Sequence, residues 1–427
     1  MRVYDSLTRG KVELPAPPGP IRMYVCGSTV YHRVHVGNAR PFVLAMWVRS
    51  WLQRTGYDVT LAHNITDVDD KVYVEAANRE VASRDLAEWA TGWFVEDTDR
   101  LGLGRPDVEP RASETMPEII AFIGELLARG LAYEVQGDVY FRVARFDDYG
   151  RLSGAKPDDM VAQEPNELKE DPRDFALWKA QKPIEDAAWD SPWGPGRPGW
   201  HIECSAMAEK HLGPAFEIHG GGNDLRFPHH ENERAQSCSL GRPFAQIWMH
   251  NGMLELDAAK MSKSLGNVVT LQNVLDTWGR ETLLVYLLTA HWRKPVDFSD
   301  DVLEQAAAQA EAFRNVLRSP SEPASEGAWE RFAAALDDDF STPEALAVMH
   351  EWRDHELLVR ALEIFGLASL AEQAEPPPEA VALAEERETA RGSGDFETAD
   401  RLRGEIAALG WEVRDVAGGF QLVPAGQ

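Results

Sequence analysis

The sequence has few cysteines and no long apolar run. The three cysteines among 427 residues, Cys26, Cys204 and Cys238, are too few and too scattered for a disulfide framework, so we expect them to be buried or to bind metal. No apolar stretch approaches the roughly 18 residues of a membrane-spanning helix, and the first residues lack the apolar core of a signal peptide. These absences predict a cytoplasmic protein with no membrane partner.

Basic residues are also scarce. The formal net charge is −27, residues 301–427 hold 26 acidic and 10 basic side chains, and lysine is absent after Lys294. Non-specific nucleic-acid binding needs a positively charged surface, so the negative net charge argues against such binding. Specific contact through local arginine patches is compatible with this net charge. With 44% hydrophobic and 26% charged residues the chain is typical of globular proteins, and its length allows two to four domains.

The first part of the chain alternates strands and helices. The pattern predicts an apolar strand over residues 22–26, an amphipathic helix over 39–55 and a second strand over 58–63. His-Val-Gly-Asn at 35–38 would lie at the helix N-terminus, where free amides and the helix dipole favour an anion. Strand, glycine-bearing loop and helix form the phosphate-binding arrangement of a doubly wound sheet, although most matches to so short a pattern arise by chance.

The next segments lead into an irregular region. Thr66, in the polar loop 64–71, can hold a ligand or cap the next helix together with Asp67, and capping is the simpler interpretation. Three further elements are predicted: two helices near 85–102 and 115–129, and a hairpin over 133–143. Residues 144–199 are rich in charge, proline and glycine, which predicts an irregular insertion between two halves of the sheet.

Residues 200–233 concentrate potential metal ligands. Cys204 offers a sulfur, and His229 and Glu233 are four residues apart, so on a helix they would lie on one face. With Cys26 they would provide two sulfurs, a nitrogen and an oxygen, a set suited to zinc. Histidines and a cysteine beside glycine turns can also simply pack or form hydrogen bonds, and this stretch alone leaves both interpretations open.

A second group of α/β elements follows. The pattern predicts a strand over 214–219, a glycine turn over 220–222, a helix over 228–239 and a strand over 247–251. Lys260 and Lys263 then lie in a loop rich in serine and glycine, where two lysines can neutralise a triphosphate. A solvated basic loop is the alternative, but its place downstream of a strand, loop and helix that fit ATP favours the nucleotide.

The sequence after residue 298 is helical and acidic. Predicted elements are helices over 300–317 and 329–336, a helix capped by Ser341, and a final unit with helices over 379–391 and 396–409 and two strands in 411–423. Five arginines of the final unit are candidates for RNA contact, although each alone is more typical of a solvated or paired helix charge: Arg387, Arg391, Arg401, Arg403 and Arg414.

Several segments, in order, resemble those of one family: MYVCGSTVY, HVGN, NITDVDDK, SPWGPGRPGWHIECSAM, WMHNGML, KMSKSLGN, LDDDFSTPEAL and GDFETADRLRGEIAALG. Over nearly its full length the chain closely resembles cysteinyl-tRNA synthetases, which are class I aminoacyl-tRNA synthetases. The expected fold is α/β: a Rossmann-like doubly wound parallel sheet with an insertion, then an all-α helical bundle and a small C-terminal α+β unit.

The resemblance also implies domains and site residues. The domains would be a catalytic domain at 1–299, with a connective insertion at about 105–199 and a stem-contact region at 260–299, a helical domain contacting tRNA at 300–372, and an anticodon-binding domain at 379–427. The implied zinc ligands are Cys26, Cys204, His229 and Glu233. The implied catalytic and ATP-binding residues are His35, Gly37, Asn38, Gly221, Asp224, Lys260, Ser262 and Lys263. Thr66, Trp200 and His219 would line the cysteine pocket.

The implied activity is that of an ATP-dependent cysteine–tRNA ligase. One Zn²⁺ per chain would select the substrate through its thiolate, and Mg²⁺ would accompany ATP. The carboxylate of L-cysteine would attack the α-phosphate of ATP, and the cysteinyl group would then pass to the terminal adenosine of tRNA(Cys). We expect a monomer. His230 and Glu231 would point away from the metal, and Cys238 would be a small buried residue.

The sequence departs from the family pattern in three places. Asn38 replaces the last histidine of HIGH, and its amide can still donate to phosphate or ribose. His32 stands where the family often has an acid, an exchange for which we have no physical account. Residues 347–375 lack a stretch that usually lengthens the helical bundle. Two alternative functions share these motifs: a ligase that joins cysteine to an amino sugar–inositol acceptor in mycothiol synthesis, and a non-catalytic zinc- and nucleotide-binding paralogue.

Overall fold

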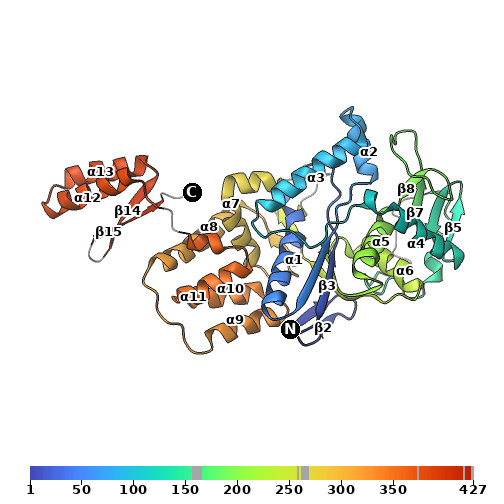
Figure 1. Ribbon diagram of the computed structural model, residues 1–427, viewed down its shortest axis with the longest axis horizontal. Helices are drawn as coiled ribbons and strands as arrows, with labels where there is room; N and C mark the ends of the chain where they lie inside the picture. Colours follow the sequence, from blue (N-terminus) through green and yellow to red (C-terminus); the bar gives the residue numbers. More distant parts are fainter. Residues whose placement is uncertain (156–165, 257–258, 261–268, 373–374, 417–418, 425–427) are drawn as a thin grey trace. The chain divides into compact units, whose positions relative to one another are not determined.

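The computed structural model describes residues 1–427 except 156–165, 257–258, 261–268, 373–374, 417–418 and 425–427. Two compact units are present, Met1–Ala368 and Ser369–Gln427. In the first unit, an antiparallel sheet and a group of helices lie at opposite ends of a central parallel sheet (Figure 1). Within the described ranges, no helix combines the length and the apolar character needed to cross a membrane.

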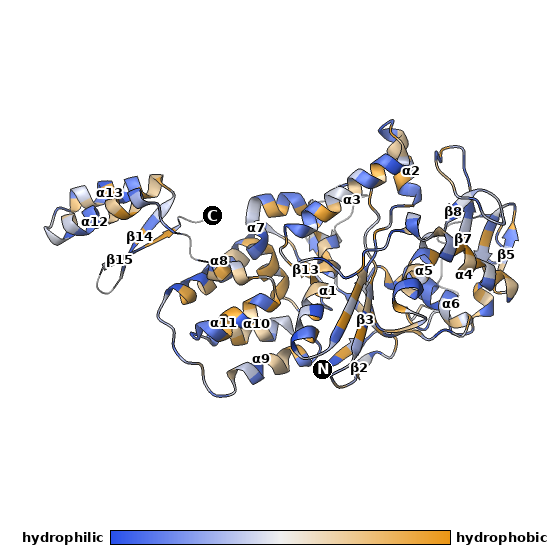
Figure 2. Cartoon of the chain, viewed as in Figure 1, coloured by the Kyte–Doolittle hydropathy of each residue, from blue (hydrophilic) through white to orange (hydrophobic). Residues whose placement is uncertain are grey.

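The parallel sheet is the expected Rossmann-like core. Its strand order is β10-β9-β3-β4, and each pair of neighbours is parallel. The strands are β3 (Pro20–Val25), β4 (Asp58–His63), β9 (Ala215–Gly222) and β10 (Phe244–Asn251). Their buried, apolar residues are visible along β3 in Figure 2. Because all four strands run the same way, the residues that follow them meet at one edge, where doubly wound sheets bind ligands.

The glycine turn expected over residues 220–222 is wrong. Gly220, Gly221 and Gly222 are the last residues of β9 and pair with β10. They are needed for close approach: a Cβ on Gly221 would lie 2.9 Å from His230 Cε1, and one on Gly222 would lie 2.4 Å from Asp224 Oδ1. Three glycines indicate a turn only where the backbone must reverse, and here the neighbouring side chains require them instead.

Three helices accompany the parallel strands: α1 (Val36–Arg54), α5 (Trp200–Leu212) and α6 (Glu231–Ser239). Most of α1 is buried, and Trp47 and Trp51 on it donate to Phe365 O and Asp337 Oδ1 in the helical region, each at 3.0 Å. The helix expected over 228–239 begins later than predicted, because a π-helical turn at Arg226–His230 precedes α6. Phe227 within that turn has extended dihedral angles.

The insertion contains more regular structure than expected. Its antiparallel sheet has the order β5-β6-β7-β8. The helices α2 (Asp70–Asn78) and α3 (Ser83–Asp99) precede the insertion, whose own elements are α4 (Met116–Ala128), β5 (Ala132–Val135), β6 (Asp138–Phe141), β7 (Phe175–Ala180) and β8 (Gly196–Pro198). The predicted hairpin is β5–β6, where Gln136 and Gly137 both have positive φ. The interpretation of residues 144–199 as irregular is wrong for β7 and β8, and the apolar run of β7 is buried with residues of α4 and α5.

The remaining elements of the first unit are short strands and helices. They are β1 (Arg2–Asp5), β2 (Gly10–Glu13), β11 (Leu254–Leu256), β12 (Ala259–Lys260), β13 (Val296–Asp297), α7 (Leu271–Leu288), α8 (Asp300–Arg318), α9 (Ala328–Asp337), α10 (Thr342–Glu351) and α11 (His355–Ile364). Ser341 is the N-cap residue of α10, as predicted, but its side chain makes no capping hydrogen bond. Only residues 352–354 separate α10 from α11, consistent with the short helical region expected from the sequence.

The second unit matches the predicted order of two helices and two strands. Its elements are α12 (Pro378–Gly392), α13 (Phe396–Ala408), β14 (Trp411–Val416) and β15 (Gly419–Pro424). Arg387 is buried, and its guanidinium donates to Asp415 at 2.9 and 3.3 Å. The suggestion that Arg387 contacts RNA is therefore wrong, because this side chain attaches α12 to the hairpin.

Candidate functional site

Four side chains from separate elements meet at the edge of the parallel sheet. Cys26 follows β3, Cys204 lies on α5, His229 lies in the π-helical turn and Glu233 lies on α6. All four are buried, and their ligand atoms lie within 4.8 Å of one another. Cys26 Sγ is 3.5 Å from both Cys204 Sγ and Glu233 Oε1, and His229 Nε2 is 3.1 Å from the same carboxylate oxygen. The group can therefore hold a metal ion.

Neighbouring imidazoles orient the carboxylate and the histidine of this group. His219 Nε2 lies 2.8 Å from Glu233 Oε2, which leaves Oε1 directed toward Cys26 and His229. His229 Nδ1 lies 2.9 Å from His201 Nδ1, so Nε2 is the nitrogen on the side of the cluster. Such outer contacts are typical of metal ligands, because they fix the ring and its tautomer.

Sequence reasoning missed His201. Trp200 stacks on the His229 ring with a centroid separation of 4.1 Å, and His201 bonds its Nδ1. A signal was present in the sequence, because Trp200 and His201 precede Cys204 by four and three residues, which places them on one face of α5.

The prediction that His230 points away from the cluster is wrong. His230 Nε2 lies 4.0 Å from Glu233 Oε1, and Cys26, His219, His230 and Glu233 form a second, overlapping group of potential ligands. The prediction considered only the 100° step from His229, whereas Glu233 is three residues after His230, and residues three apart on a helix are neighbours. His230 Nδ1 is also 2.8 Å from His250 Nε2. Glu231 does face elsewhere and accepts from Ser153 N at 2.7 Å.

Burial controls the protonation of the cluster. It raises the pKa of the Cys26 thiol well above its usual value, raises the pKa of Cys204, and lowers the pKa of His229. Side chains alone therefore favour neutral thiols and a neutral imidazole, and a divalent cation would reverse this for the thiols by stabilising thiolates. Two sulfurs, one imidazole nitrogen and one carboxylate oxygen are donors that zinc accepts, so the residues fit that ion.

A cleft of about 430 Å³ opens beside this group. Cys26 is among its lining residues, so the metal-binding group and the cleft share a wall. The lining comes from the loop after β3, the start of α1, the ends of β9 and β10, and the loop at Asp224. Of the expected ATP-binding residues, His35, Gly37, Asn38 and Asp224 line it, whereas Gly221 lies inside β9 and its neighbour Gly222 lines the cleft instead.

The start of α1 is joined to the segment after the KMSKS sequence. Val36 N donates to Val269 O at 2.9 Å, and His35 forms a bridge with Thr270. Asn38 Nδ2 donates to Ser28 Oγ at 2.7 Å. Of the expected lysine-loop residues, Lys260 ends β12, and Ser262 and Lys263 lie outside the described residues.

The three expected cysteine-pocket residues have different positions. Trp200 lines the cleft, whereas His219 lies behind Glu233. Thr66 is buried and accepts from Asn64 Nδ2 at 3.1 Å, beside Thr29 of the cleft wall.

Two further expectations about this region are wrong. Thr66 and Asp67 do not cap α2, because its N-cap is Asp69, whose carboxylate accepts from Lys71 N at 2.9 Å. Cys238 is only partly buried, and it packs at the margin of a hydrophobic cluster rather than inside it.

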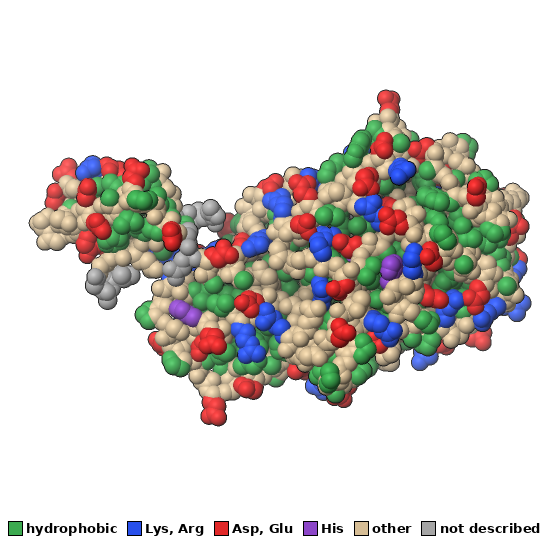
Figure 3. Space-filling view, in the orientation of Figure 1, with side chains coloured by type: hydrophobic (Ala, Val, Ile, Leu, Met, Phe, Trp, Pro, Cys, Tyr) green, Lys and Arg blue, Asp and Glu red, His purple; other side chains and the backbone are tan. Residues whose placement is uncertain are grey.

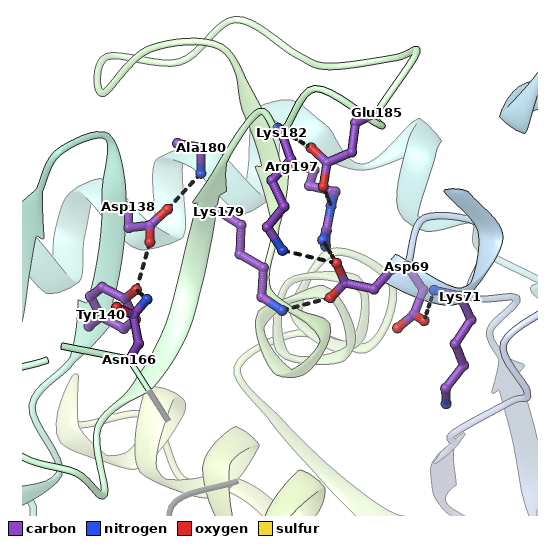
Figure 4. Close-up of polar contacts among 11 residues, drawn as sticks. Asp69, Lys71, Asp138, Tyr140, Asn166, Lys179, Ala180, Lys182, Glu185 and Arg197 are labelled. Carbon is purple, nitrogen blue, oxygen red and sulfur yellow. Dashed lines mark hydrogen bonds and ion pairs between the residues drawn. The ribbon is translucent and has the colours of Figure 1, made fainter. Parts of the chain in front are cut away.

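An ionic network holds α2 against the antiparallel sheet. Lys179 Nζ lies 2.9 Å and Lys182 Nζ lies 3.3 Å from the Asp70 carboxylate, which Arg197 also contacts. Figure 4 labels the three basic side chains of this network. Arg197 is buried and also donates to buried Glu185 at 2.9 Å. Burial alone would raise the pKa of Asp70, but the nearby positive charges outweigh it and lower the pKa to about 2.

This network borders a second cavity of about 250 Å³, which shares Lys71 and Trp200 with the first cleft. His32 lies on the wall of the larger cleft, where its Nδ1 accepts from Arg79 Nη2 at 2.7 Å. On the face in Figure 3, Lys and Arg side chains are dispersed among Asp and Glu. A polyanion approaching this face would therefore meet single basic side chains and no continuous basic surface, in agreement with the net charge of −27.

Comparison with known proteins covers almost the whole chain. Residues 14–308 match the family described as tRNA synthetases class I (C) catalytic domain, residues 331–368 match the DALR domain, and residues 374–422 match the cysteinyl-tRNA ligase anticodon binding domain. The chain is 43% identical over 464 residues to the cysteine–tRNA ligase of Brevibacillus brevis, with 99% of each chain covered. It is 44% identical over 454 residues to that of Thioalkalivibrio sulfidiphilus, with 98% of each covered.

Among solved structures, methionyl-tRNA synthetase of Mycobacterium tuberculosis in complex with methionyl-adenylate is similar, with a TM-score of 0.59 and 15% identity. The match covers 92% of this chain and 90% of that chain. At this identity the likeness concerns the fold: a parallel sheet with an insertion, followed by helices.

Proposed function

Because this chain belongs to the cysteinyl-tRNA synthetases of class I, we propose that it joins L-cysteine to tRNA(Cys) at the expense of ATP. The observation that carries the proposal is the position of the group formed by Cys26, Cys204, His229 and Glu233, which is buried and borders the nucleotide cleft. A substrate held by its sulfur at that group would have its carboxylate directed into the cleft, where ATP reacts.

We assign one Zn²⁺ per chain to the four ligands. Bound there, the ion supplies a soft Lewis acid that takes the substrate sulfur and lowers the pKa of its thiol. Serine carries a hard hydroxyl of high pKa, and pocket shape alone would separate it from cysteine by only ~10–200-fold. His219 and His201 keep Glu233 and His229 in place for this selection.

The residues of the cleft would carry adenylation. The cysteine carboxylate attacks the α-phosphorus of ATP, the bond to the β-phosphate oxygen breaks, and pyrophosphate leaves with its Mg²⁺. His35 and Asn38 stand at the start of α1 and line the cleft, where the positive end of the helix dipole favours phosphate oxygens. Lys260 and Lys263 would stabilise the charge that develops on the pyrophosphate. The acyl group then passes from the adenylate to the 2′-hydroxyl of the terminal adenosine, and AMP leaves.

The same proposal includes the location and partners of the protein. We place a monomer in the cytoplasm, with tRNA contacted by the helical region at 300–372 and by the final unit at 379–427. Thr66, Trp200 and His219 would shape the cysteine pocket, Trp200 directly and the other two from behind its wall. Gly37, Gly221, Asp224 and Ser262 would complete the ATP site.

The test combines two reactions on the purified protein. We expect cysteine-dependent exchange of pyrophosphate into ATP, sensitive to a zinc chelator, and transfer of cysteine to tRNA. Exchange without transfer to tRNA would instead favour the ligase with an amino sugar–inositol acceptor. ATP binding with no exchange at all would favour a non-catalytic paralogue.

A further inference from the structure

Arg40 is a buried cation beside the nucleotide cleft. It lies one turn into α1 and is 4% exposed. Its Nη1 donates to Gly252 O at 2.6 Å and to Met253 O at 3.3 Å, and its Nη2 reaches His291 O at 3.4 Å. Within the described part of the chain its acceptors are these backbone carbonyl oxygens, and none is a carboxylate. A buried charge without an opposite charge is costly, so its retention needs a reason beyond stability.

The carbonyls that Arg40 holds belong to a wall of the cleft. Met253 and Asn251 line the cleft together with Gly37 and Asn38 at the start of α1, and a Cβ on Gly37 would lie 4.0 Å from Leu254 Cβ, so the two segments are adjacent. Asn251 Nδ2 donates to the same Gly252 oxygen at 3.0 Å, so this carbonyl receives two donors. The guanidinium therefore connects α1 to the neighbouring backbone that follows β10.

Gly252 and Met253 are also attached to the segment 291–296. Gly252 N donates to Trp292 O at 2.8 Å, and Val296 N donates to Met253 O at 3.0 Å. A Cβ on Gly252 would lie 2.1 Å from Lys294 O, so only glycine permits this close approach. The backbone at Gly252 and Met253 is thus held by Arg40 and by the segment 291–296 together, and a change at Arg40 would remove part of this attachment.

We propose that Arg40 is a positioning residue for ATP: by holding Gly252 and Met253 against α1, it fixes the part of the nucleotide cleft that these two segments line, without touching the nucleotide. This inference rests on the proposed ATP-dependent function. A planar guanidinium can donate to carbonyls of two segments at once, whereas a lysine ammonium is a point charge on a flexible stem. The forked geometry of the guanidinium, and not its positive charge alone, would then be required to position Gly252 and Met253.

The variants Arg40→Lys and Arg40→Met test this in cysteine-dependent pyrophosphate exchange. Losing hydrogen bonds from a charged donor predicts a rise of about tenfold in KM for ATP in both variants, with the KM for cysteine within about twofold of wild type. The Kd for ATP, measured without cysteine, should rise in parallel. Zinc content should stay unchanged, because Arg40 makes no contact with the metal-binding group.

Arg49→Met is the matched control. Arg49 lies on the same helix and donates to Arg105 O at 2.8 Å and to Asp107 at 2.6 Å, outside the cleft. The Arg49→Met variant should have a lower Tm than wild type and an unaltered KM for ATP. An unchanged KM for ATP in Arg40→Lys, or equal losses for ATP and cysteine in both Arg40 variants, would overturn the proposal. Absence of exchange in the wild-type protein would instead refute the proposed function, so the two failures are distinct.

Discussion

Two polar regions adjoin Trp200 and differ in how their charges are matched. In the ionic network around Asp70, each carboxylate faces basic side chains, and the buried Arg197 lies between Asp70 and Glu185. In the metal-binding group, two thiols, a carboxylate and several imidazoles converge, and burial disfavours the charged form of each thiol. In the network around Asp70, the side chains balance one another's charges. The metal-binding group instead consists of electron-pair donors for a cation that side chains do not provide.

This difference indicates that the network around Asp70 stabilises the fold, whereas the metal-binding group serves the function. A network whose charges are matched by its own side chains holds α2 to the antiparallel sheet and needs nothing from outside. A buried set of electron-pair donors from four elements is explained by binding a metal ion. Changes in the two regions should therefore affect different measurements, activity and metal content in one, and the free energy of unfolding in the other.

The largest effect is expected for Cys204→Ser. Replacing a thiolate ligand by a hydroxyl removes a donor that zinc prefers, so metal affinity should fall by more than ~100-fold, as should the rate of cysteine activation. The preference for cysteine over serine should relax. Metal content per chain by elemental analysis, with pyrophosphate exchange for both amino acids, measures the two effects.

Cys238→Ser is the control for this change, because Cys238 lies outside the metal-binding group and is only partly buried. It should retain metal and selectivity. Full metal content in Cys204→Ser, with selectivity intact, would mean that the group formed with Cys26, His229 and Glu233 is not the metal site.

A smaller effect, on stability, is expected for Glu185→Gln. The Glu185 and Arg197 side chains are 1% and 2% exposed, and removing one partner leaves the other buried and partly unpaired. The free energy of unfolding should fall by about 3 kcal/mol, measured by urea titration. Zinc content and exchange rate per folded molecule should not change.

Glu170→Gln is the control, because it breaks an exposed pair with Arg142 in the same part of the chain and should leave the urea midpoint unchanged. A loss of metal or of exchange in Glu185→Gln would remove the distinction between the two regions.

Sequence patterns predicted the elements whose cause is local. Period and turn chemistry placed the parallel strands, and Gln136 with Gly137 placed the β5–β6 hairpin, because those signals lie within a few residues. The i, i+4 spacing of His229 and Glu233 placed both on one side of the cluster. Cys26 completed this donor set as one of two open interpretations, and the family resemblance then implied it as a ligand, since no local signal connects residues so far apart in sequence.

The errors arose where distant groups decide the structure. Gly220, Gly221 and Gly222 were taken for a turn because the neighbours that exclude a side chain, such as His230, come from another element. His230 differs from expectation for a local reason: its angle from His229 was considered, but not its i, i+3 spacing to Glu233. Thr66 resembles a cap, but Asp69 performs that role and Thr66 is buried behind the cleft. No sequence pattern indicates a role for Arg40, because its acceptors are carbonyls of residues more than two hundred positions away.

The smallest effect concerns acid stability through Asp70. Its folded pKa of about 2 lies below its ordinary value of 3.8, so its stabilisation is complete above pH 4 and is lost as the pH falls toward 2. Because the side chain is 44% exposed, solvent screening limits the effect to about 1 kcal/mol. Between pH 5 and pH 3, wild type should therefore lose more unfolding free energy than Asp70→Asn in urea titrations. Asp276→Asn, which breaks an exposed pair with Arg100, should follow wild type. Identical pH slopes for wild type and Asp70→Asn would show that Asp70 is not stabilised by its basic neighbours.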